Sequence, residues 1–527
     1  MHNLLTDPLI RVQLVDGETA AMSLPEIYEA ASAHEVAAFP ALRPHQRHAW
    51  HAFLAQLGTI AVQRAGLAEI PRAASEWRTF LRGLTADFDE YEPWQLIVDD
   101  PVQPAFMQCP ADDTLSQYRR RVATPDDLDL LVTSKNHDVK QAAATTSAPD
   151  DWVFALIDLQ TMAGFLGAGN YGVTRMNGGF SARPCLGLAP ADGGFGAHLF
   201  HDMQRMLQNR PKLLERLSEY YRTENGTALL WTAPWDGTTS FDLGDLDPYF
   251  IEICRRVRLC IKDRRIVAKT AGSKKSRVAA KAAHGNVGDF WTPVSKGDAK
   301  ALSLSSAGFR YDRLNKLLFD GNAYDLPPAM TVAATAKRRW RVVARGMAGG
   351  QGKTDGYHER NDIVFAPRVA TAFGRKEERD ELAAISSRLL DEIAEVSRAL
   401  RLGVAVAASG GKLLADLSKS DRTHGSPYAR RFDAWVDPRF FGAVEQRFVA
   451  GGQATRKAER ASFARDMVAV AETILKGAVE SLPCPAIRRH RARARAFSAF
   501  YGSLRGAKSV FNDQPEIFSA QEPAHVE

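Results

Sequence analysis

Residues 378–402 read ERDELAAISSRLLDEIAEVSRALRL, and their apolar side chains return at steps of three and four positions. The repeating residues are Leu382, Ile385, Leu389, Ile393, Val396 and Leu400. This spacing places them on one face of a helix, while charged residues occupy much of the remaining surface. The segment therefore predicts a long amphipathic helix that packs against other helices through a bundle-type seam.

The sequence beyond this helix predicts three more helices. A Gly-Gly break begins at Gly410, and THGSPY around His424 predicts a turn. A second helical face, ending before Gly451 and Gly452, contains Phe441, Val444, Phe448 and Val449. A third helix is expected over residues 453–476, and the prolines within 483–485 separate it from a fourth.

The fourth helix has an apolar and a basic face. We expect the first to consist of Ile487, Ala494, Phe497, Tyr501 and Leu504, and the second of Arg488, Arg491 and Arg495. Four helices joined by short loops favour an antiparallel four-helix bundle, here assigned to residues 367–527.

Residues 1–366 mix short strand-like runs with helices. LIRVQLV near Ile10, with a turn at Asp16, and WQLIVDD near Ile97 predict strands. Apolar residues at helical spacing predict a helix over residues 46–65. The expected fold class is α+β, with a large irregular mixed α/β domain over residues 1–366 followed by the C-terminal bundle.

Composition indicates a globular protein of the cytoplasm. The 527 residues are 45% hydrophobic and 25% charged, enough for a large core. The N-terminus lacks the basic and apolar regions of a secretory signal, and no stretch approaches the roughly 20 apolar residues that span a membrane.

Cysteine usage argues against a disulfide framework. The five cysteines, an odd number and scattered along the chain, are Cys109, Cys185, Cys254, Cys260 and Cys484. A zinc site at Cys254 and Cys260 with His284 is one alternative. Buried free thiols are the favoured interpretation, so no metal and no cofactor is expected.

Positive charge is concentrated in two blocks. The first, residues 255–281, includes Arg264, Arg265, Lys274 and Lys275, and the second, residues 488–508, includes Arg488, Arg491 and Arg495. Phosphate binding is a common role for such blocks. Solvated helix faces or loops are the alternative for each.

The densest glycine run is GFLGAGNYGVTRMNGGFSARP, residues 164–184. Glycine is costly to order unless the backbone needs positive φ or must approach something closely, so a ligand laid against the backbone is one interpretation and a structural loop the other. The spacing matches neither a dinucleotide fingerprint nor a phosphate-binding P-loop. Arg175 and Arg183 within the run favour an anionic ligand.

Two further segments attract attention. MAGGQGKTDGYHER, residues 347–360, predicts a hairpin with Gln351, Lys353 and Thr354 at its apex; either the apex projects functional side chains or the hairpin is simply exposed.

TSKNHDVKQ, residues 133–141, predicts a loop. An enzyme hypothesis makes the chain a metal-dependent nuclease with His137 and Asp138 in its active site, helped by His424. The sequence shows no second cluster of residues that would supply the metal-binding carboxylates of such an active site.

Six motifs occur in an order that resembles a known family. They are NLLTDPLIRV, AFMQ at residues 105–108, KNHD at 135–138, GAGNYGVTRMNGG, TAPWDG at 232–237 and GGQGKTDGYHER. Together with the two-part layout they resemble CasA, the large subunit of the type I-E CRISPR Cascade complex, over nearly the whole chain.

The resemblance implies a DNA-binding subunit that is not an enzyme. Such a subunit recognises the PAM beside the target in the minor groove, helps to open the duplex for the crRNA and helps to recruit the helicase-nuclease. The implied partners are target double-stranded DNA, crRNA, that helicase-nuclease, and the backbone, small and crRNA-handle-binding subunits of Cascade; no membrane is implied.

The resemblance also assigns residues. Those matching the glycine loop that approaches the minor groove are Gly167, Ala168, Gly169 and Asn170, and Lys296 matches a lysine that reaches the same groove. The hairpin with Gln351, Lys353 and Thr354 matches a wedge that opens the duplex. The loop that docks onto Cascade and the crRNA handle is matched by Lys135, Asn136, His137 and Asp138.

The basic residues gain roles on the same grounds. Arg264, Arg265, Lys274 and Lys275 are expected to guide the incoming duplex, and Arg488, Arg491 and Arg495 to hold the displaced strand or contact small subunits. The sequence departs from the family in two respects. Thr354 stands where some members carry the wedge glutamine, with Gln351 three residues earlier, and the zinc-binding cysteine cluster of some members is missing.

Overall fold

The computed structural model describes residues 2–112, 114–130, 147–221, 226–333, 336–350 and 353–518. The chain divides into two compact units. The first comprises Met1–Phe309 and Asn322–Val364, and the second comprises Arg310–Gly321 and Phe365–Glu527. A short helical segment of the second unit is therefore inserted within the sequence of the first.

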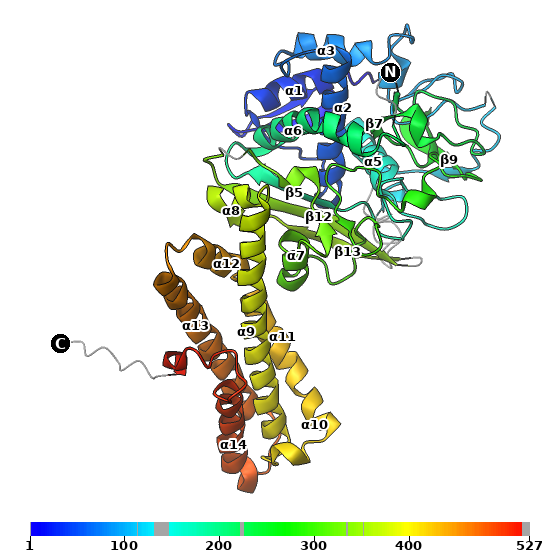
Figure 1. The fold of residues 1–527 in the computed structure, drawn as a ribbon. Coiled ribbons are helices and arrows are strands. Elements are labelled where there is room, and N and C mark those ends of the chain that lie inside the picture. The colour runs from blue at the N-terminus through cyan, green and yellow to red at the C-terminus, as the bar shows by residue number, and fades with distance from the viewer. Residues whose placement is uncertain are drawn as a thin grey trace. The chain divides into compact units, whose positions relative to one another are not determined.

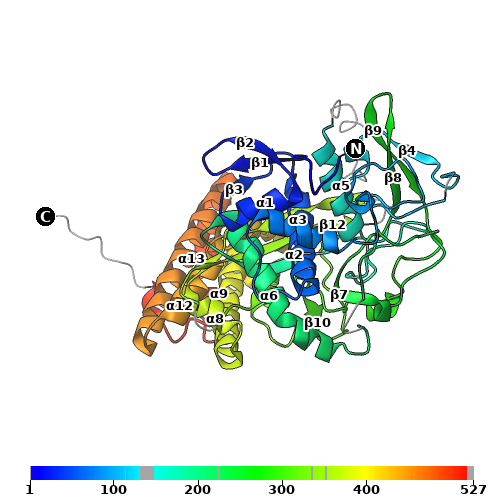
Figure 2. The same ribbon diagram turned by 90° about the horizontal axis from the view of Figure 1, so that it is seen from above.

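Helix α2 (Arg47–Arg64) forms the centre of the first unit and confirms the helix predicted over residues 46–65. It packs against α5 (Pro149–Met162), α6 (Gly194–Arg216) and α3 (Ala74–Gly83), as Figure 2 shows. Nearly every side chain along α2 is buried, polar ones included. Gln56 is accommodated because its amide donates to the carbonyl oxygens of Tyr249 and Phe250, both at 3.0 Å.

Several small sheets surround these helices. The hairpin expected at Asp16 is confirmed, since β1 (Ile10–Leu14) pairs antiparallel with β2 (Thr19–Met22). A second sheet joins β5 (Cys185–Pro190), β12 (Trp340–Gly350), β13 (Lys353–Arg360) and β14 (Val364–Phe365). A third has the order β4 (Arg120–Val122), β9 (Arg265–Ala271), β8 (Arg256–Lys262).

The strand predicted in WQLIVDD near Ile97 is wrong. Within that segment, all of which the structure describes, only Gln95 forms a bridge, an isolated one with Asn3. The buried guanidinium of Arg258 instead donates to the carbonyl oxygens of Val98 and Asp100, at 3.2 and 2.9 Å. These carbonyl oxygens accept hydrogen bonds from a buried cation instead of from a neighbouring strand. The local sequence gives no sign of this distant donor.

Helix α9 (Lys376–Ala408) organises the second unit and confirms the long helix predicted from residues 378–402. Its seam is buried at five of the six predicted positions, and only Ile385 is partly exposed. Helices α11 (Gly425–Val436), α13 (Gln453–Ser481) and α14 (Ala486–Leu504) pack along α9. Figure 1 shows successive long helices running in opposite directions.

The remaining helices of this unit follow the predicted boundaries with two exceptions, the first being that α13 continues to Ser481 instead of ending near residue 476. Helix α12 (Phe440–Val449) ends before Gly451 as expected, and α13 begins at Gln453. The turn predicted from THGSPY is largely wrong, because His424 alone separates α10 (Lys419–Thr423) from α11, which starts at Gly425. Pro427 is tolerated there since the first turn of a helix does not use its N–H groups.

The predicted apolar face of α14 is also wrong for most of its residues. The buried side chains are Ala492, Ala496, Phe500 and Leu504, whereas Ile487 is 92% exposed. The reason is close helix packing: a Cβ at Gly403 of α9 would lie 3.1 Å from the Ala496 carbonyl oxygen. Small residues at the contact let the two helices approach, and this outweighs the burial of larger apolar residues on another face.

Candidate nucleic-acid interface

The glycine-rich stretch forms a tight, exposed turn over residues 166–170, called here the glycine turn. Asn170 N donates to Gly167 O at 3.0 Å, and Leu166 N donates to Asn170 O at 3.0 Å. Gly167 and Gly169 have φ of 108° and 85°, a left-handed backbone that other residues disfavour. Ala168 and Asn170 are exposed. The turn therefore presents backbone and small side chains to its surroundings.

Part of the first basic block, residues 255–281, lies directly against this turn. Ser273 N donates to Gly169 O at 3.1 Å, and the Tyr171 hydroxyl donates to the Lys274 carbonyl oxygen at 3.1 Å. Lys274 and Lys275 are exposed, while their backbone N–H groups bond to Gly237 O. The backbone of both lysines is thus held beside the glycine turn, while their side chains are exposed.

Two further basic residues of this block, Arg264 and Arg265, lie at the opposite end of β9. Arg264 forms the hairpin tip between β8 and β9 with Asp263, both at positive φ, and Arg265 begins β9. Both arginines are exposed. A seven-residue strand spans about 20 Å, so the structure brings Lys274 and Lys275 to the glycine turn but leaves Arg264 and Arg265 away from it.

Four other arginines of the block are structural rather than available to phosphate. Arg255, Arg256, Arg258 and Arg277 are buried and donate to backbone carbonyl oxygens. Arg255 holds the base of the glycine turn, because its guanidinium donates to Gly164 O at 3.0 Å and also to Tyr171 O. The sequence shows their charge but not their burial.

Sequence reasoning missed a run of cations beside this block. Arg119, Arg120 and Arg121 are exposed, and β4 pairs with β9 so that Arg121 lies opposite Lys269. Figure 2 shows β4, β8 and β9 together at one side of the first unit. The sequence shows three consecutive arginines, but only the pairing of β4 with β9 places them next to the basic block of residues 255–281.

A cavity of about 270 Å³ lies beside the glycine turn. Its walls include Ala168, Gly169 and Asn170 from the turn, and Arg120 and Thr270 from β4 and β9. Residues 127–130 complete another side. The turn therefore has open space next to its backbone, bordered by cationic elements.

The predicted hairpin is confirmed by the antiparallel pairing of β12 with β13. Gly350 pairs with Lys353, so residues 351 and 352 connect the strands. Gln351 lies outside the described residues, and of Lys353 only the backbone is described. Thr354 lies opposite Gly349, and its hydroxyl donates to Leu130 O at 3.4 Å.

The hairpin lies on the glycine-rich stretch. Ala182 N donates to Met347 O at 3.1 Å, and a Cβ at Gly349 would collide with the Phe180 carbonyl group. Glycine at 349 is required by this close approach. Hairpin, glycine-rich stretch and the segment ending at Leu130 are therefore neighbours, although they are distant in sequence.

Lys296 follows β10 (Val294–Ser295), which pairs with β11 (Tyr324–Asp325). Its ammonium lies 3.3 Å from Asp325 Oδ1, and both side chains are largely exposed. Asn177, within the glycine-rich stretch, donates to the carbonyl oxygen of Ala301, a residue that forms an isolated bridge with Val294 of β10. Asn177 therefore connects the segment that carries Lys296 to the glycine-rich stretch, at a position outside the glycine turn.

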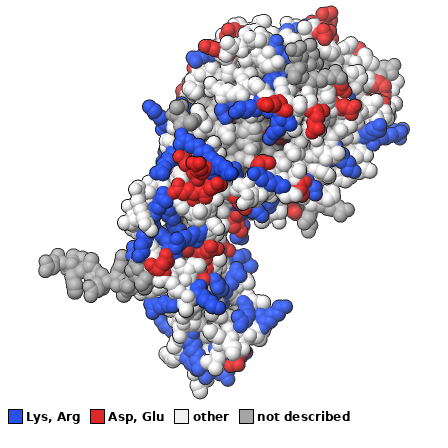
Figure 3. Space-filling model, in the orientation of Figure 1, with Lys and Arg blue, Asp and Glu red and all other residues white. Residues whose placement is uncertain are grey.

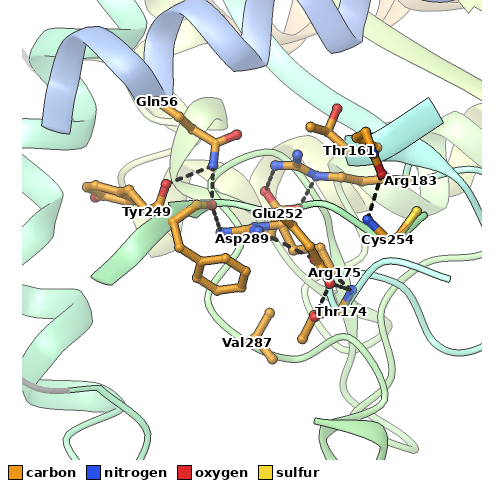
Figure 4. Close-up of polar contacts among 12 residues, drawn as sticks. Gln56, Thr161, Thr174, Arg175, Arg183, Tyr249, Glu252, Cys254, Val287 and Asp289 are labelled. Carbon is orange, nitrogen blue, oxygen red and sulfur yellow. Dashed lines mark hydrogen bonds and ion pairs between the residues drawn. The ribbon is translucent and has the colours of Figure 1, made fainter. Parts of the chain in front are cut away.

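The expectation that Arg175 and Arg183 attract an anionic ligand is wrong. Both are buried and held by carboxylates within the fold, as Figure 4 shows. Arg183 donates twice to Asp289, at 2.5 and 2.7 Å. Arg175 donates to Phe250 O at 2.9 Å and lies 3.9 Å from Glu252, whose carboxylate accepts from Thr174 N.

These pairs set the ionisation of the buried acids. Burial raises the pKa of Asp289, but the charge and hydrogen bonds of Arg183 lower it more, to about 2. Asp289 is therefore an anion that balances Arg183. The network attaches the end of the glycine-rich stretch to the core rather than presenting charge to a ligand.

The alternative zinc site is not assembled among the described residues. Cys254 is buried, its thiol donates to Leu159 O at 3.2 Å, and burial raises its pKa to about 11. Within the described part of the chain, two groups of potential metal ligands occur, and neither includes a cysteine. Free buried thiols remain the description for Cys109, Cys185 and Cys254.

The docking loop and the nuclease hypothesis concern residues outside the described ranges. Lys135, Asn136, His137 and Asp138 all lie between residues 131 and 146. His424 is exposed in the second unit, and its Nδ1 lies 2.9 Å from the Ser420 carbonyl oxygen. The nuclease hypothesis therefore stays untested.

The basic face of α14 is exposed as predicted. Arg488, Arg491 and Arg495 are all exposed, and Figure 3 shows Lys and Arg side chains gathered at the end of the second unit where α14 begins. Arg495 also donates to Gly411 O at 2.6 Å, just beyond the C-terminus of α9. A cation at that end is favoured by the helix dipole, so part of this face has a structural role.

A family model for the CRISPR-associated protein Cse1 matches residues 3–476. The chain belongs to the Cse1 family. This confirms the resemblance to CasA, the name that Cse1 of Thermus thermophilus also carries, and makes the chain a member of a family of Cascade subunits. No curated protein matches it.

Solved structures of Cse1 proteins share the fold of this Cse1-family chain. Cse1 from Acidimicrobium ferrooxidans is 14% identical, with a TM-score of 0.63 over 96% of this chain and 98% of its own. Thermobifida fusca Cse1 is 13% identical, with a TM-score of 0.64 over 95% and 97%. A CasA structure from Thermus thermophilus is 15% identical, with a TM-score of 0.62 over 95% and 99%. The α+β class is thereby confirmed.

No helix in the described ranges of this Cse1-family chain combines the length and apolarity that crossing a bilayer demands.

Proposed function

We propose that this chain is the PAM-recognising subunit of a type I-E Cascade complex and is not an enzyme. The observation that carries the proposal is the glycine turn, with exposed Ala168 and Asn170, open space beside it and two lysines next to it. The minor groove of DNA is only about 6 Å wide and admits little more than bare backbone and small side chains. A turn of this composition suits that groove.

Neighbouring elements would complete recognition. Lys296 pairs with exposed Asp325, and such surface pairs contribute about 1 kcal/mol or less, so the ammonium can exchange its partner for a base edge. The β12–β13 hairpin, with Gln351, Lys353 and Thr354, is proposed to open the duplex. Its position next to the glycine-rich stretch supports this role.

Cations around the turn would bind phosphate without reading sequence. Lys274 and Lys275 lie next to the glycine turn, while Arg264, Arg265 and Arg119 to Arg121 extend the charge along β9 and β4. Phosphate contacts fix the register of a protein on DNA. The exposed α14 arginines, Arg488, Arg491 and Arg495, are proposed to hold the displaced strand or to contact small subunits.

Assembly and recruitment belong to the same proposal. Residues 135–138 are proposed to dock the chain onto the crRNA handle and neighbouring Cascade subunits in the cytoplasm. Recruitment of the helicase-nuclease after target binding completes the role expected of this family.

Substitution Ala168→Trp tests the glycine turn. Alanine 168 does not have positive φ, so tryptophan adds bulk at the exposed tip without straining the backbone. In Cascade reconstituted with the variant, we expect affinity for targets with the correct PAM to fall roughly tenfold or more, as expected when one specific groove interaction is removed. Gel-shift titrations on targets with and without the PAM measure this.

Ala21→Trp is the matched control, because Ala21 is exposed on β2, whose sheet consists of β1, β2 and β3 and includes none of the strands that border the glycine turn. It should leave both affinities unchanged. Equal losses on targets with and without the PAM would show that the turn does not read sequence. Unchanged discrimination by Ala168→Trp would reject the assignment.

A further inference from the structure

A buried group of potential metal ligands lies beneath the segment that ends at Leu130. It consists of His45 in η1 (Pro44–Gln46), Asp129 after η3 (Pro125–Asp127), and Asp158 on α5. The three side chains are at most 3% exposed. One nitrogen and two carboxylate oxygens lie within 4.8 Å of one another.

The hydrogen bonds satisfy only one of the two carboxylates. His45 Nε2 lies 2.8 Å from each oxygen of Asp129 but 4.0 Å from Asp158 Oδ2. Gln46 also donates to Asp129, at 2.7 Å. Asp158 Oδ2 is fully buried and has no hydrogen-bond partner among the described residues.

Within this group, two buried carboxylates face a single imidazole. An isolated buried carboxylate is costly unless it is paired, protonated or bound to a metal. A cavity of about 10 Å³, close to the size of one water molecule, is lined by both His45 and Asp158. Two arginines also lie on its wall, and each already pairs with another carboxylate, Arg183 with Asp289 and Arg345 with Glu359.

We propose that His45, Asp129 and Asp158 bind one divalent transition-metal ion, zinc or manganese. One imidazole and two carboxylates form a mixed nitrogen and oxygen ligand set of the kind that these ions accept. The ion would join the segment that ends at Leu130 to α5 and to the start of α2. Residues 127–130 also line the cavity beside the glycine turn, so the ion would stiffen one wall of the proposed DNA site.

The second cluster in the described part of the molecule serves as the internal comparison. His51 and His198 both approach Asp202 Oδ2, at 2.8 and 3.4 Å, and the Trp291 indole donates to the same oxygen at 2.8 Å. One carboxylate there faces three nitrogen groups. The other oxygen of this carboxylate, Asp202 Oδ1, is buried without a hydrogen-bond partner among the described residues, as Asp158 Oδ2 is. The two clusters therefore differ in the number of carboxylates, one against two.

Metal analysis and calorimetry on the full chain test the proposal. After removal of metal with EDTA, we expect the protein to bind about one equivalent of Zn²⁺ or Mn²⁺ and to gain thermal stability. Asp158→Asn keeps the shape of the side chain and removes its charge. It should weaken binding at least tenfold while the stripped protein remains folded. Co²⁺ titration, read by visible absorption, reports the ligand set independently.

His198→Gln is the control and should leave binding unchanged, because it alters only the second cluster. Binding that survives Asp158→Asn but is lost in His198→Gln would overturn the assignment. Purified protein without metal that also fails to bind Zn²⁺ or Mn²⁺ after stripping would overturn it as well, and would assign the balancing charge to a proton. Neither result bears on PAM discrimination, which the Ala168→Trp test measures separately.

Discussion

Asp289 and Arg183 anchor the glycine-rich stretch through one charged pair, and its strength depends on pH. Asp289 has a pKa of about 2 in the fold against an ordinary value of 3.8. A lowered carboxyl pKa stabilises the fold fully above the ordinary value, and this contribution is lost as pH falls through 3.8 toward 2. A shift of this size corresponds to about 2 kcal/mol.

Asp289→Asn should therefore destabilise the protein at pH 7 by at least about 2 kcal/mol, because it also leaves the Arg183 charge buried without a partner. The difference between variant and wild type should shrink as pH falls from about 4 to 2. Hydrogen exchange of peptides covering residues 174–184 and 285–293 measures the difference. A difference in stability between variant and wild type that stays constant over this pH range would contradict the pairing of Asp289 with Arg183.

Lys274 and Lys275 carry a prediction about salt. Replacing both with glutamine should weaken binding of Cascade to DNA with and without the PAM to the same extent. The slope of log affinity against log salt should become shallower by about 1 for each phosphate that the variant no longer binds. Gel shifts between 50 and 200 mM salt, roughly the range over which such interactions respond, measure the slope.

Lys212→Gln with Arg216→Gln removes two exposed charges from α6 and is the matched control. It should leave the slope nearly unchanged. A loss of affinity confined to PAM-containing targets in the Lys274 and Lys275 variant would instead assign these lysines to base recognition.

Charge in a sequence does not say whether a cation faces solvent. Arg264 and Lys274 are exposed as predicted, yet Arg175, Arg183 and Arg255 are buried within the fold. Their partners include backbone carbonyl oxygens and carboxylates 70 or more positions away in the sequence. Such pairing depends on tertiary structure, which no local pattern reports.

At the scale of elements, periodicity predicted the helices well. The seam of α9 and the glycines that bound α12 follow from local rules of burial and helix termination. The contact between the glycine turn and Ser273 does not, because it joins segments more than 100 residues apart. The buried face of α14 was missed since helix proximity at Gly403 selects small residues there.

Glu392 on α9 joins three helices of the second unit. Its fully buried carboxylate accepts from Arg447 of α12 at 2.9 Å and from Arg460 of α13 at 2.5 Å. Breaking a buried ion pair by removing one partner costs about 3–5 kcal/mol, because the other charge stays buried. Glu392→Gln should destabilise the second unit by about 3 kcal/mol or more.

Hydrogen exchange in α9, α12 and α13 measures this destabilisation. Glu381→Gln is the control, since Glu381 pairs with Arg456 on the surface of the same helices. An exposed pair contributes about 1 kcal/mol or less, so that variant should exchange nearly as wild type does. Equal effects of the two substitutions would contradict a central role for Glu392.

At the scale of the whole molecule, the division into units does not follow the order of the chain. Arg310–Gly321, which contains α7 (Tyr311–Leu318), belongs with the helices that begin after Val364. Its sequence is short and lies among strands, and no local feature marks it as part of the helical unit. Only the partners of its side chains reveal this.

Phe319 provides the test, because the three aromatic rings that it contacts all belong to the second unit. Its ring stacks on Phe373 with centroids 5.8 Å apart, and it also contacts Phe365 and Phe441. Phe319 is 1% exposed, and truncating a buried phenylalanine costs about 3–5 kcal/mol. Phe319→Ala should therefore speed hydrogen exchange in α8 (Pro367–Ala372), α9 and α12.

Strands β5 and β12 should exchange as in wild type, because they belong to the first unit although they flank position 319 in sequence. Phe309→Ala is the matched control: Phe309 is also buried but ends the segment assigned to the first unit. Phe309→Ala should speed hydrogen exchange in β5 and β12 and leave exchange in α8, α9 and α12 as in wild type. Faster exchange in β5 and β12 after Phe319→Ala would mean that α7 stabilises the first unit, and the two-unit division would have to be redrawn.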